Sequence, residues 1–227
     1  MDSLLDIEIE NCFSPNLTSK LILKAMVDKL NFDCSILELG CGSGFISINF
    51  AKNKSKNFNF FASDISKKAV DTAKKNYKDN NIICELKQSD GFKSWDNQKF
   101  DVVVSDVSAI DEKVANISKW YLNAPCKTGD GGYRIILRLI SEVSEHLNKG
   151  GSFIFPLISL SSLDKIKDHL KSNNFIFEEI YLTEWPLPDY FHKFTKDLNL
   201  RKDKGYINFK EKFGKLICWT SVLIAHK

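Results

Sequence analysis

Apolar residues in this chain gather in short runs that alternate with amphipathic stretches. Runs rich in β-branched or aromatic residues predict buried strands at 35–39, 58–63, 82–86, 100–105, 152–158, 175–182 and 216–226. Apolar residues at helical spacing predict helices between them, over 19–30, 45–52, 66–77, 133–147 and 163–170. Strands that alternate with helices indicate an α/β fold with a mostly parallel sheet and helices on both faces.

Polar and glycine residues mark where these elements begin and end. Thr18-Ser19 is expected to cap the first helix, and Ser66 caps a later one. The Lys149-Gly150-Gly151 run is expected to stop the helix that starts at Tyr133. Pro156 fits a bulge or a strand end better than a central ladder position.

Two long connections stand out between the predicted elements. A loop is predicted from Val107 to about Gly132, and a polar, aromatic insert covers residues 185–215. An insert of that length usually covers or recognises something, so a lid or substrate wall is expected, with a satellite core as the alternative. No repeat or flexible linker divides the sequence, which predicts one domain over 1–227 with a helical lead-in at 1–31.

The most informative motif follows the first strand. Glu38 is followed by Gly40-Cys41-Gly42 and then by Gly44, where a helical pattern begins. Glycines at this spacing allow positive φ and leave bare main chain against which a ligand can lie. A dinucleotide fingerprint would place its last glycine where Phe45 stands. The motif resembles motif I of class I S-adenosylmethionine-dependent methyltransferases.

Acidic residues also close the successive strands. Ligands of open α/β sheets bind beyond the carboxyl ends of the strands, where Glu38, Asp64, Asp90 and Asp106 are expected to gather. Asp64 lies 64 − 40 = 24 residues after Gly40, a spacing that suits a carboxylate accepting hydrogen bonds from two ribose hydroxyls. A single Asp at a strand end is also a common turn residue. The joint pattern favours S-adenosylmethionine over a nicotinamide cofactor.

The resemblance extends to the "small" methyltransferase group, which includes protein-glutamine (release-factor) and RNA-base methyltransferases. The matching segments are residues 13–19, 100–105, 129–132 and 149–151. The resemblance implies a Rossmann-like sheet of seven strands, mostly parallel, with an antiparallel C-terminal strand. It also implies a cofactor site that adds Cys41, Ile65 and Gly91 to the glycines and acids, with Asp90 near the adenine amino group and Asp106 beside the reacting methyl.

The chain departs from that group after the fourth strand. The group carries Asn-Pro-Pro-Tyr, which grips a planar amide or base nitrogen; here the residues are Asp106-Val107-Ser108-Ala109. Asp106 could still accept a hydrogen bond from the acceptor or remove its proton, but no ring stands at Ala109. Its role as a cap that touches only the cofactor is the alternative.

Three functions therefore stay open. The first is methyl transfer to an N or O nucleophile of a small-molecule or peptide-like acceptor. The second keeps the group's macromolecular acceptors, a protein glutamine or an RNA base. The third is a non-catalytic methyltransferase-fold partner protein, against which the intact glycine turn and Asp64 argue.

Composition narrows the setting without naming the acceptor. The 227 residues are 43% hydrophobic and carry a net charge of +3, which does not demand a nucleic-acid partner. Six cysteines without zinc spacing indicate reduced, mostly buried thiols and no metal site. No signal peptide or membrane span is expected, so the predicted location is cytoplasmic. The oligomeric state cannot be read from the sequence.

Overall fold

The computed structural model describes residues 7–9, 12, 14–53, 57–107, 110–121 and 127–227. Every structural statement below concerns these residues. Phe13, Ser108, Ala109 and Cys126, which were singled out in the sequence, lie outside them.

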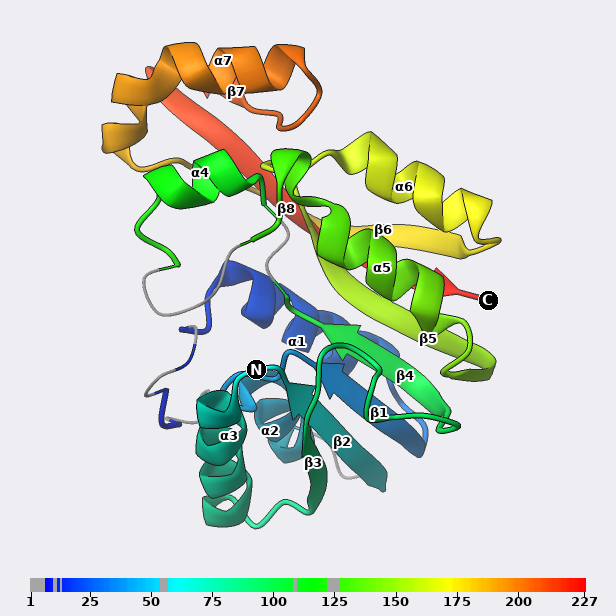
Figure 1. Cartoon of the computed structure of the whole chain (residues 1–227). Helices are drawn as coiled ribbons and strands as arrows, with labels where there is room; N and C mark the ends of the chain where they lie inside the picture. Colours follow the sequence, from blue (N-terminus) through cyan, green and yellow to red (C-terminus); the bar gives the residue numbers. More distant parts are fainter. Residues whose placement is uncertain (1–6, 10–11, 13, 54–56, 108–109, 122–126) are drawn as a thin grey trace.

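Strands and helices alternate along most of the chain (Figure 1). The strands are β1 (Cys34–Leu39), β2 (Phe58–Asp64), β3 (Cys84–Gln88), β4 (Phe100–Ser105), β5 (Leu147–Ile158), β6 (Ile176–Pro186), β7 (Lys210–Lys212) and β8 (Lys215–His226). The α-helices are α1 (Leu17–Lys29), α2 (Phe45–Lys52), α3 (Lys67–Asp79), α4 (Glu112–Ile117), α5 (Arg134–Val143), α6 (Leu163–Ser172) and α7 (Thr195–Asp203). Two 3-10 helices are η1 (Asp130–Gly132) and η2 (Asp189–Phe194).

The strands form one sheet in the order β3-β2-β1-β4-β5-β8-β6, and the short β7 pairs with β8. Strands β1 to β5 pair in parallel, whereas β8 runs antiparallel to both β5 and β6. The predicted α/β fold, with a mostly parallel sheet and an antiparallel C-terminal strand, is confirmed. Over the described residues the sheet has eight strands and not the expected seven, because the three-residue β7 pairs with β8. The order reverses at β1, so the crevice beyond the ends of β1 and β4 is where such sheets bind ligands.

Helices cover both faces of the sheet (Figure 1). On one face, α1 and α2 pack on the strands through residues such as Met26 and Phe50. On the other face, α5 and α6 pack through residues such as Leu139 and Leu170. A separate apolar cluster joins α4 to η2, α7 and β8, with Phe191 and Leu198 fully buried in it. The insert 185–215 therefore has a core of its own.

Several boundaries differ from the sequence prediction. Asn16, and not Thr18 or Ser19, is the N-cap of α1: its Oδ1 accepts the Thr18 N–H at 2.8 Å. The predicted loop 107–132 contains α4, which Asp111 caps. That helix has only six residues, too few to show a helical period.

The helix predicted over 133–147 ends at Val143, and β5 already begins at Leu147. Gly150 and Gly151 thus lie inside a strand. The pairing of β5 with β4 shifts between Phe100 and Val102. Gly150 has φ +78° there, and a Cβ on Gly151 would lie 3.0 Å from the Asp101 carbonyl oxygen. Glycine with positive φ is favoured both at a strand bulge and after the end of a helix. The two glycines were therefore wrongly predicted to stop a helix.

The outer strands also differ from their predicted bounds. On the edge of the sheet, β3 starts at Cys84 and leaves Ile83 fully exposed. At the other edge, β6 continues past a register shift to Pro186. Pro156 lies inside the ladder of β5 with β8, opposite Val222 and two residues before the strand ends, so the expected bulge or strand end is found only on the β4 side, where pairing stops at Ile154.

Candidate active site

The turn after β1 presents bare main chain at the carboxyl end of the sheet. Gly40, Gly42 and Gly44 all have positive φ, of 70°, 53° and 79°. The N–H groups of Gly40 and Cys41 donate to the Ser63 carbonyl of β2 at 2.8 and 3.0 Å, which fixes the turn. A Cβ on Gly42 would meet no atom within 4 Å. The space beside Gly42 is therefore open to a ligand.

Asp64 lies beside this open space at the end of β2. Its Oδ2 accepts the Gly42 N–H at 3.0 Å, and its Oδ1 accepts the Ser66 N–H at 2.8 Å. Each carboxylate oxygen has a second lone pair that can accept from a ligand hydroxyl. Ile65 follows with 58% of its surface exposed and offers an apolar wall.

Glu38 lies beneath the turn and is 2% exposed. Its Oε2 accepts both the backbone N–H, at 3.2 Å, and the hydroxyl of Ser47 on α2. Burial raises the pKa of Glu38 to about 7, while the Ser47 hydrogen bonds lower it. Burial likewise raises the pKa of the Cys41 thiol well above its ordinary value. Cys41 is thus a protonated, packed side chain beneath the turn.

Asp90, after β3, is held by two cations. Its Oδ1 and Oδ2 accept from Arg138 of α5 at 2.6 and 3.1 Å, and its Oδ2 pairs with Lys93 at 2.7 Å. These partners hold the pKa of Asp90 well below its usual range. A Cβ on Gly91 would lie 3.3 Å from the Arg138 guanidinium. Arg138 could not be linked to Asp90 from the sequence, because α5 comes close to this loop only in the folded chain.

Asp106 directly follows β4 and contacts the first turn of α1. Its Oδ2 accepts the Ser19 hydroxyl at 2.5 Å. Burial raises the pKa of Asp106 to about 6, and hydrogen bonds from Ser19 and Thr18 lower it. A carboxyl with a pKa near the working pH is suited to take a proton. Sequence reasoning treated Ser19 only as a cap and missed this contact.

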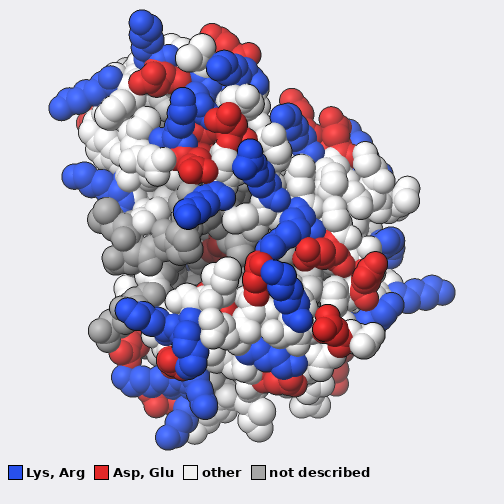
Figure 2. Space-filling model, viewed as in Figure 1, with Lys and Arg blue, Asp and Glu red and all other residues white. Residues whose placement is uncertain are grey.

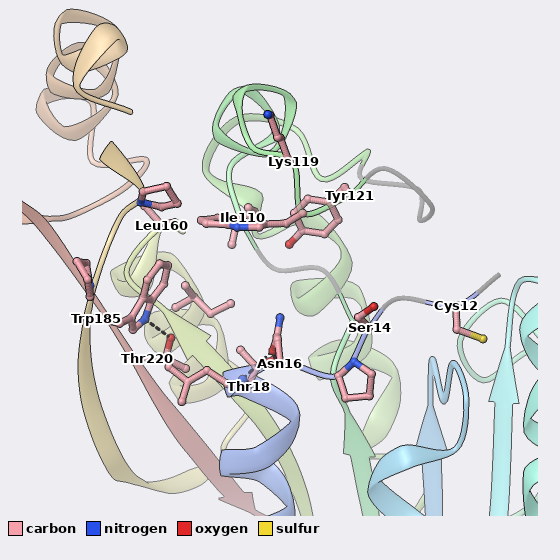
Figure 3. A pocket seen from close by; sticks show the side chains of 16 residues that line it. Cys12, Ser14, Asn16, Thr18, Ile110, Lys119, Tyr121, Leu160, Trp185 and Thr220 are labelled. Atoms are coloured by element: carbon pink, nitrogen blue, oxygen red, sulfur yellow. Dashed lines mark hydrogen bonds between the residues drawn. The ribbon is translucent and has the colours of Figure 1, made fainter. Parts of the chain in front are cut away.

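A pocket of about 600 Å³ adjoins this corner (Figure 3). Four stretches form most of it: the segment leading into α1, the loop after β4, the end of β5, and the end of β6 with the residues after it. Labelled side chains in it include Asn16, Thr18, Ile110, Tyr121, Leu160, Trp185 and Thr220. Thr18 lines the pocket and also bonds Asp106, so the pocket and the carboxylate share one wall.

Aromatic rings form one side of the pocket. The Trp120 ring meets the Trp185 ring edge-on, at 5.8 Å between centroids, and lies 5.7 Å from Phe191. The Trp185 indole N–H donates to the Thr220 hydroxyl at 2.9 Å. From the predicted insert, Trp185, Pro186 and Pro188 line the pocket, while apolar residues such as Leu187, Phe191 and Leu198 belong to the separate cluster.

A buried ion pair fixes the loop after β4 against the insert. Arg201 of α7 donates to Asp111, which is fully buried, and to Asp130. Asp111 also accepts the N–H groups of Val114, at 3.2 Å, and Gly131, at 2.6 Å. One carboxylate therefore joins α4, η1 and α7 behind the wall that carries Trp120.

The described residues hold no group of three or more His, Cys, Asp or Glu side chains placed to bind a metal ion. In the same part of the chain, no helix is both long and apolar enough to cross a membrane. The five described cysteines are free, and four of them are buried.

A sheet of this order, with a glycine turn after β1 and carboxylates at the ends of β1, β2 and β4, defines a class I methyltransferase fold. The family model described as methyltransferase small domain matches residues 14–176. The chain belongs to that family. The predicted class, an S-adenosylmethionine-dependent methyltransferase with that cofactor, is confirmed.

Proteins with similar sequences are named as methyltransferases. A Methanocaldococcus jannaschii protein, named as a candidate protein N5-glutamine methyltransferase, is 37% identical over 61% of this chain and 68% of its own length. The ribosomal protein L11 methyltransferase of Lactobacillus johnsonii is 31% identical over 71% of this chain and 43% of its own length. The release factor glutamine methyltransferase of Streptococcus pneumoniae is 30% identical over 59% of this chain and 49% of its own length. The chain spans less than half the length of the latter two.

Solved structures show the same fold at low sequence identity. A methyltransferase from Pyrococcus furiosus superimposes with a TM-score of 0.61 at 19% identity, over 98% of this chain and 89% of that one. A T. thermophilus 16S rRNA methyltransferase, solved with AdoMet and guanosine, superimposes with a TM-score of 0.60 at 13% identity. The match covers 94% of this chain and 44% of that one.

Proposed function

We propose that this chain transfers a methyl group from S-adenosylmethionine to an N or O nucleophile of a small-molecule acceptor, or of a peptide-like one of similar size. The observation that supports this most directly is the pocket of about 600 Å³ that shares Thr18 with Asp106. Pockets of 300–1,000 Å³ are typical of small-molecule sites. In this proposal the whole chain works as one domain, and residues 185–215 supply a wall of the acceptor site.

The residues around the glycine turn fit the cofactor. The open space at Gly42 admits a ligand against the main chain, and Asp64 lies within hydrogen-bond distance of that turn. We assign Glu38, Gly40, Cys41, Gly42, Gly44, Asp64, Ile65, Asp90, Gly91 and Asp106 to the cofactor site. The Asp90 carboxylate is already bonded to Arg138 and Lys93, so we assign the contact with adenine to the backbone around Gly91.

The chemistry asks little of the protein beyond positioning. S-adenosylmethionine supplies a methyl group activated by its positive sulfur, which keeps the C–S electron pair when the acceptor's lone pair forms the new bond. Asp106 orients the acceptor and, where the nucleophile carries a proton, takes that proton as a carboxylate. The pKa of about 6 keeps Asp106 ionised, and so able to act as a base, at neutral pH.

A macromolecular acceptor is the second candidate, because relatives are named for protein glutamine, ribosomal protein L11 and 16S rRNA. RNA binding would be supported by a continuous basic face. On the face shown in Figure 2, acidic and basic side chains are instead interspersed. The net charge of +3 agrees with that pattern. The charge pattern on this face therefore does not favour an RNA acceptor, and the pocket volume is the observation that favours a small acceptor over a protein one.

Calorimetry with S-adenosylmethionine and S-adenosylhomocysteine tests the proposal. We expect micromolar binding by the wild type and at least a tenfold loss in Asp64→Ala, since that carboxylate contacts the turn directly. Asp203→Ala is the matched control, because α7 lies apart from the turn. Absence of binding by the wild type would contradict the proposal and favour a non-catalytic partner protein.

A further inference from the structure

Trp185 presents its ring, and not its polar edge, to a ligand in the pocket. The Trp185 indole N–H is already bonded to Thr220, so what remains for a ligand is the apolar face of that ring. Trp120 packs edge-on against Trp185 and also contacts Phe191, which is fully buried. Each ring contacts its neighbours, so this aromatic wall is in place before any ligand arrives.

Asn16 supplies a directed polar group opposite that wall. Its Oδ1 accepts the Thr18 N–H at 2.8 Å, and it lies 2.7 Å from the Thr18 hydroxyl, whose single proton can go either to this oxygen or to Asp106. The oxygen is therefore fixed toward α1, and Figure 3 shows the amide nitrogen of Asn16 pointing into the cavity. An amide nitrogen can only donate. The ligand group that faces Asn16 must accept a hydrogen bond.

Charge in the pocket does not favour a cationic ligand. Among the described lining residues, Lys119 is the only charged side chain, and it is exposed at the rim. Most of the other lining side chains are apolar, including Leu17, Ile110, Ile158 and Leu160. An amine held here as a cation would be surrounded by these apolar groups, which disfavours its charge.

We infer that the methyl acceptor is a planar aromatic molecule that packs on Trp120 and Trp185 and carries a carbonyl or similar oxygen facing Asn16. This inference rests on the proposed function and deepens it. Aromatic pairs gain affinity beyond the area they bury. The nucleophilic O–H or N–H of the acceptor then lies toward Asp106, which shares the Thr18 wall.

Two probes that differ only in the ring test the inference: 4-hydroxybenzamide and trans-4-hydroxycyclohexanecarboxamide. Binding of each is measured by calorimetry to protein saturated with S-adenosylhomocysteine, so the readout does not depend on turnover. We expect the aromatic probe to bind at least about threefold tighter. Trp185→Leu should remove this preference. Trp185→Phe, which keeps a ring but loses the bond to Thr220, should retain it.

Asn16→Asp tests the polar contact with a side chain of the same shape. Aspartate still caps α1 through an oxygen but presents a second oxygen, not an N–H, to the cavity. The wild type should bind 4-hydroxybenzamide more tightly than phenol, and the variant should lose that difference. Thermal unfolding of each variant, compared with the wild type, shows that the fold is retained.

The outcomes separate the inference from the proposed function. Equal or tighter binding of the cyclohexane probe overturns the aromatic class, as does an unchanged preference in Trp185→Leu. If S-adenosylhomocysteine binds but neither probe does, the aromatic class fails while the methyl-donor site stands. If S-adenosylhomocysteine does not bind, the proposed function fails, and the inference fails with it.

Discussion

The Ser19 hydroxyl donates to Oδ2 of Asp106 at 2.5 Å, although 87 positions separate the two residues in the chain. The same Ser19 oxygen accepts the backbone N–H of Asn16 at 3.3 Å, which completes the capping box of α1. One serine thus joins the start of the first helix to the end of β4. The lead-in helix is thereby part of the candidate active site.

Ser19→Ala should move the pH dependence of methyl transfer. The Ser19 hydrogen bond stabilises ionised Asp106, so its loss raises the pKa above about 6. If Asp106 acts as the base, the acidic limb of kcat/KM should shift upward by roughly one pH unit, while the rate above pH 8 changes little. Ser19→Thr keeps a hydroxyl and should restore the profile. An unshifted limb in Ser19→Ala would show that Asp106 is not the group being titrated.

Glu38→Gln should change how stability depends on pH. The folded-state pKa of about 7 exceeds the ordinary 4.5, so the folded protein binds more protons than the unfolded chain between those values. Stability from this group is therefore greatest at low pH and falls as pH rises toward 7, by up to roughly 3 kcal/mol. Urea unfolding at pH 5 and pH 8 should show a smaller fall in the variant. Equal falls would contradict a buried, protonatable Glu38.

Gly42→Ala should cost cofactor affinity more than stability. An alanine at φ +53° should lower the free energy of unfolding by about 1–2 kcal/mol, because L-residues disfavour this conformation. Its methyl group meets no protein atom within 4 Å. The methyl group instead occupies the space where the cofactor would lie, so S-adenosylmethionine should bind at least tenfold more weakly. Gly214→Ala is the matched control, with φ +70° and no atom within 4 Å, in the turn between β7 and β8. Similar calorimetric affinities for the two variants would exclude a close approach at Gly42.

Arg201→Met should strongly destabilise the fold. It leaves Asp111 buried without its cation, which costs about 3–5 kcal/mol. Asp130, the other partner of Arg201, is exposed, so Asp130→Asn should cost less than about 1 kcal/mol. Urea unfolding of both variants measures the difference. An Arg201→Met protein as stable as Asp130→Asn would mean that solvent reaches Asp111.

The glycine turn and the strand-ending acids could be predicted because each is local in sequence. Gly40 to Gly44 follow one strand directly, and Asp64 and Asp106 each end another, so a pattern of elements suffices to bring them together. The bulge at Gly150 misled the prediction, since glycine serves strands and helix ends alike.

The pocket could be predicted only in part: the insert that carries Trp185 was expected to form a wall, but the stretches that meet it were not. Asn16, Ile110 and Trp185 belong to separate stretches that meet only in the folded chain. The partners of Asp90 and Asp106 are likewise distant: Arg138 lies 48 positions from the first, and Ser19 lies 87 from the second. The spacing of residues in a single sequence does not indicate which distant side chains will form hydrogen bonds with each other.

The central place of β8 in the sheet has a consequence for biosynthesis. This strand, residues Lys215–His226, fills the space between β5 and β6. Before β8 leaves the ribosome, β1 to β5 can already pair in their parallel order. At that stage β5 has an unpaired edge, and β6 has no neighbouring strand. Nascent chains are thus exposed to strand-edge aggregation until β8 emerges. Truncations within β8 should accordingly accumulate in inclusion bodies or with chaperones, and not as soluble, weakened enzyme.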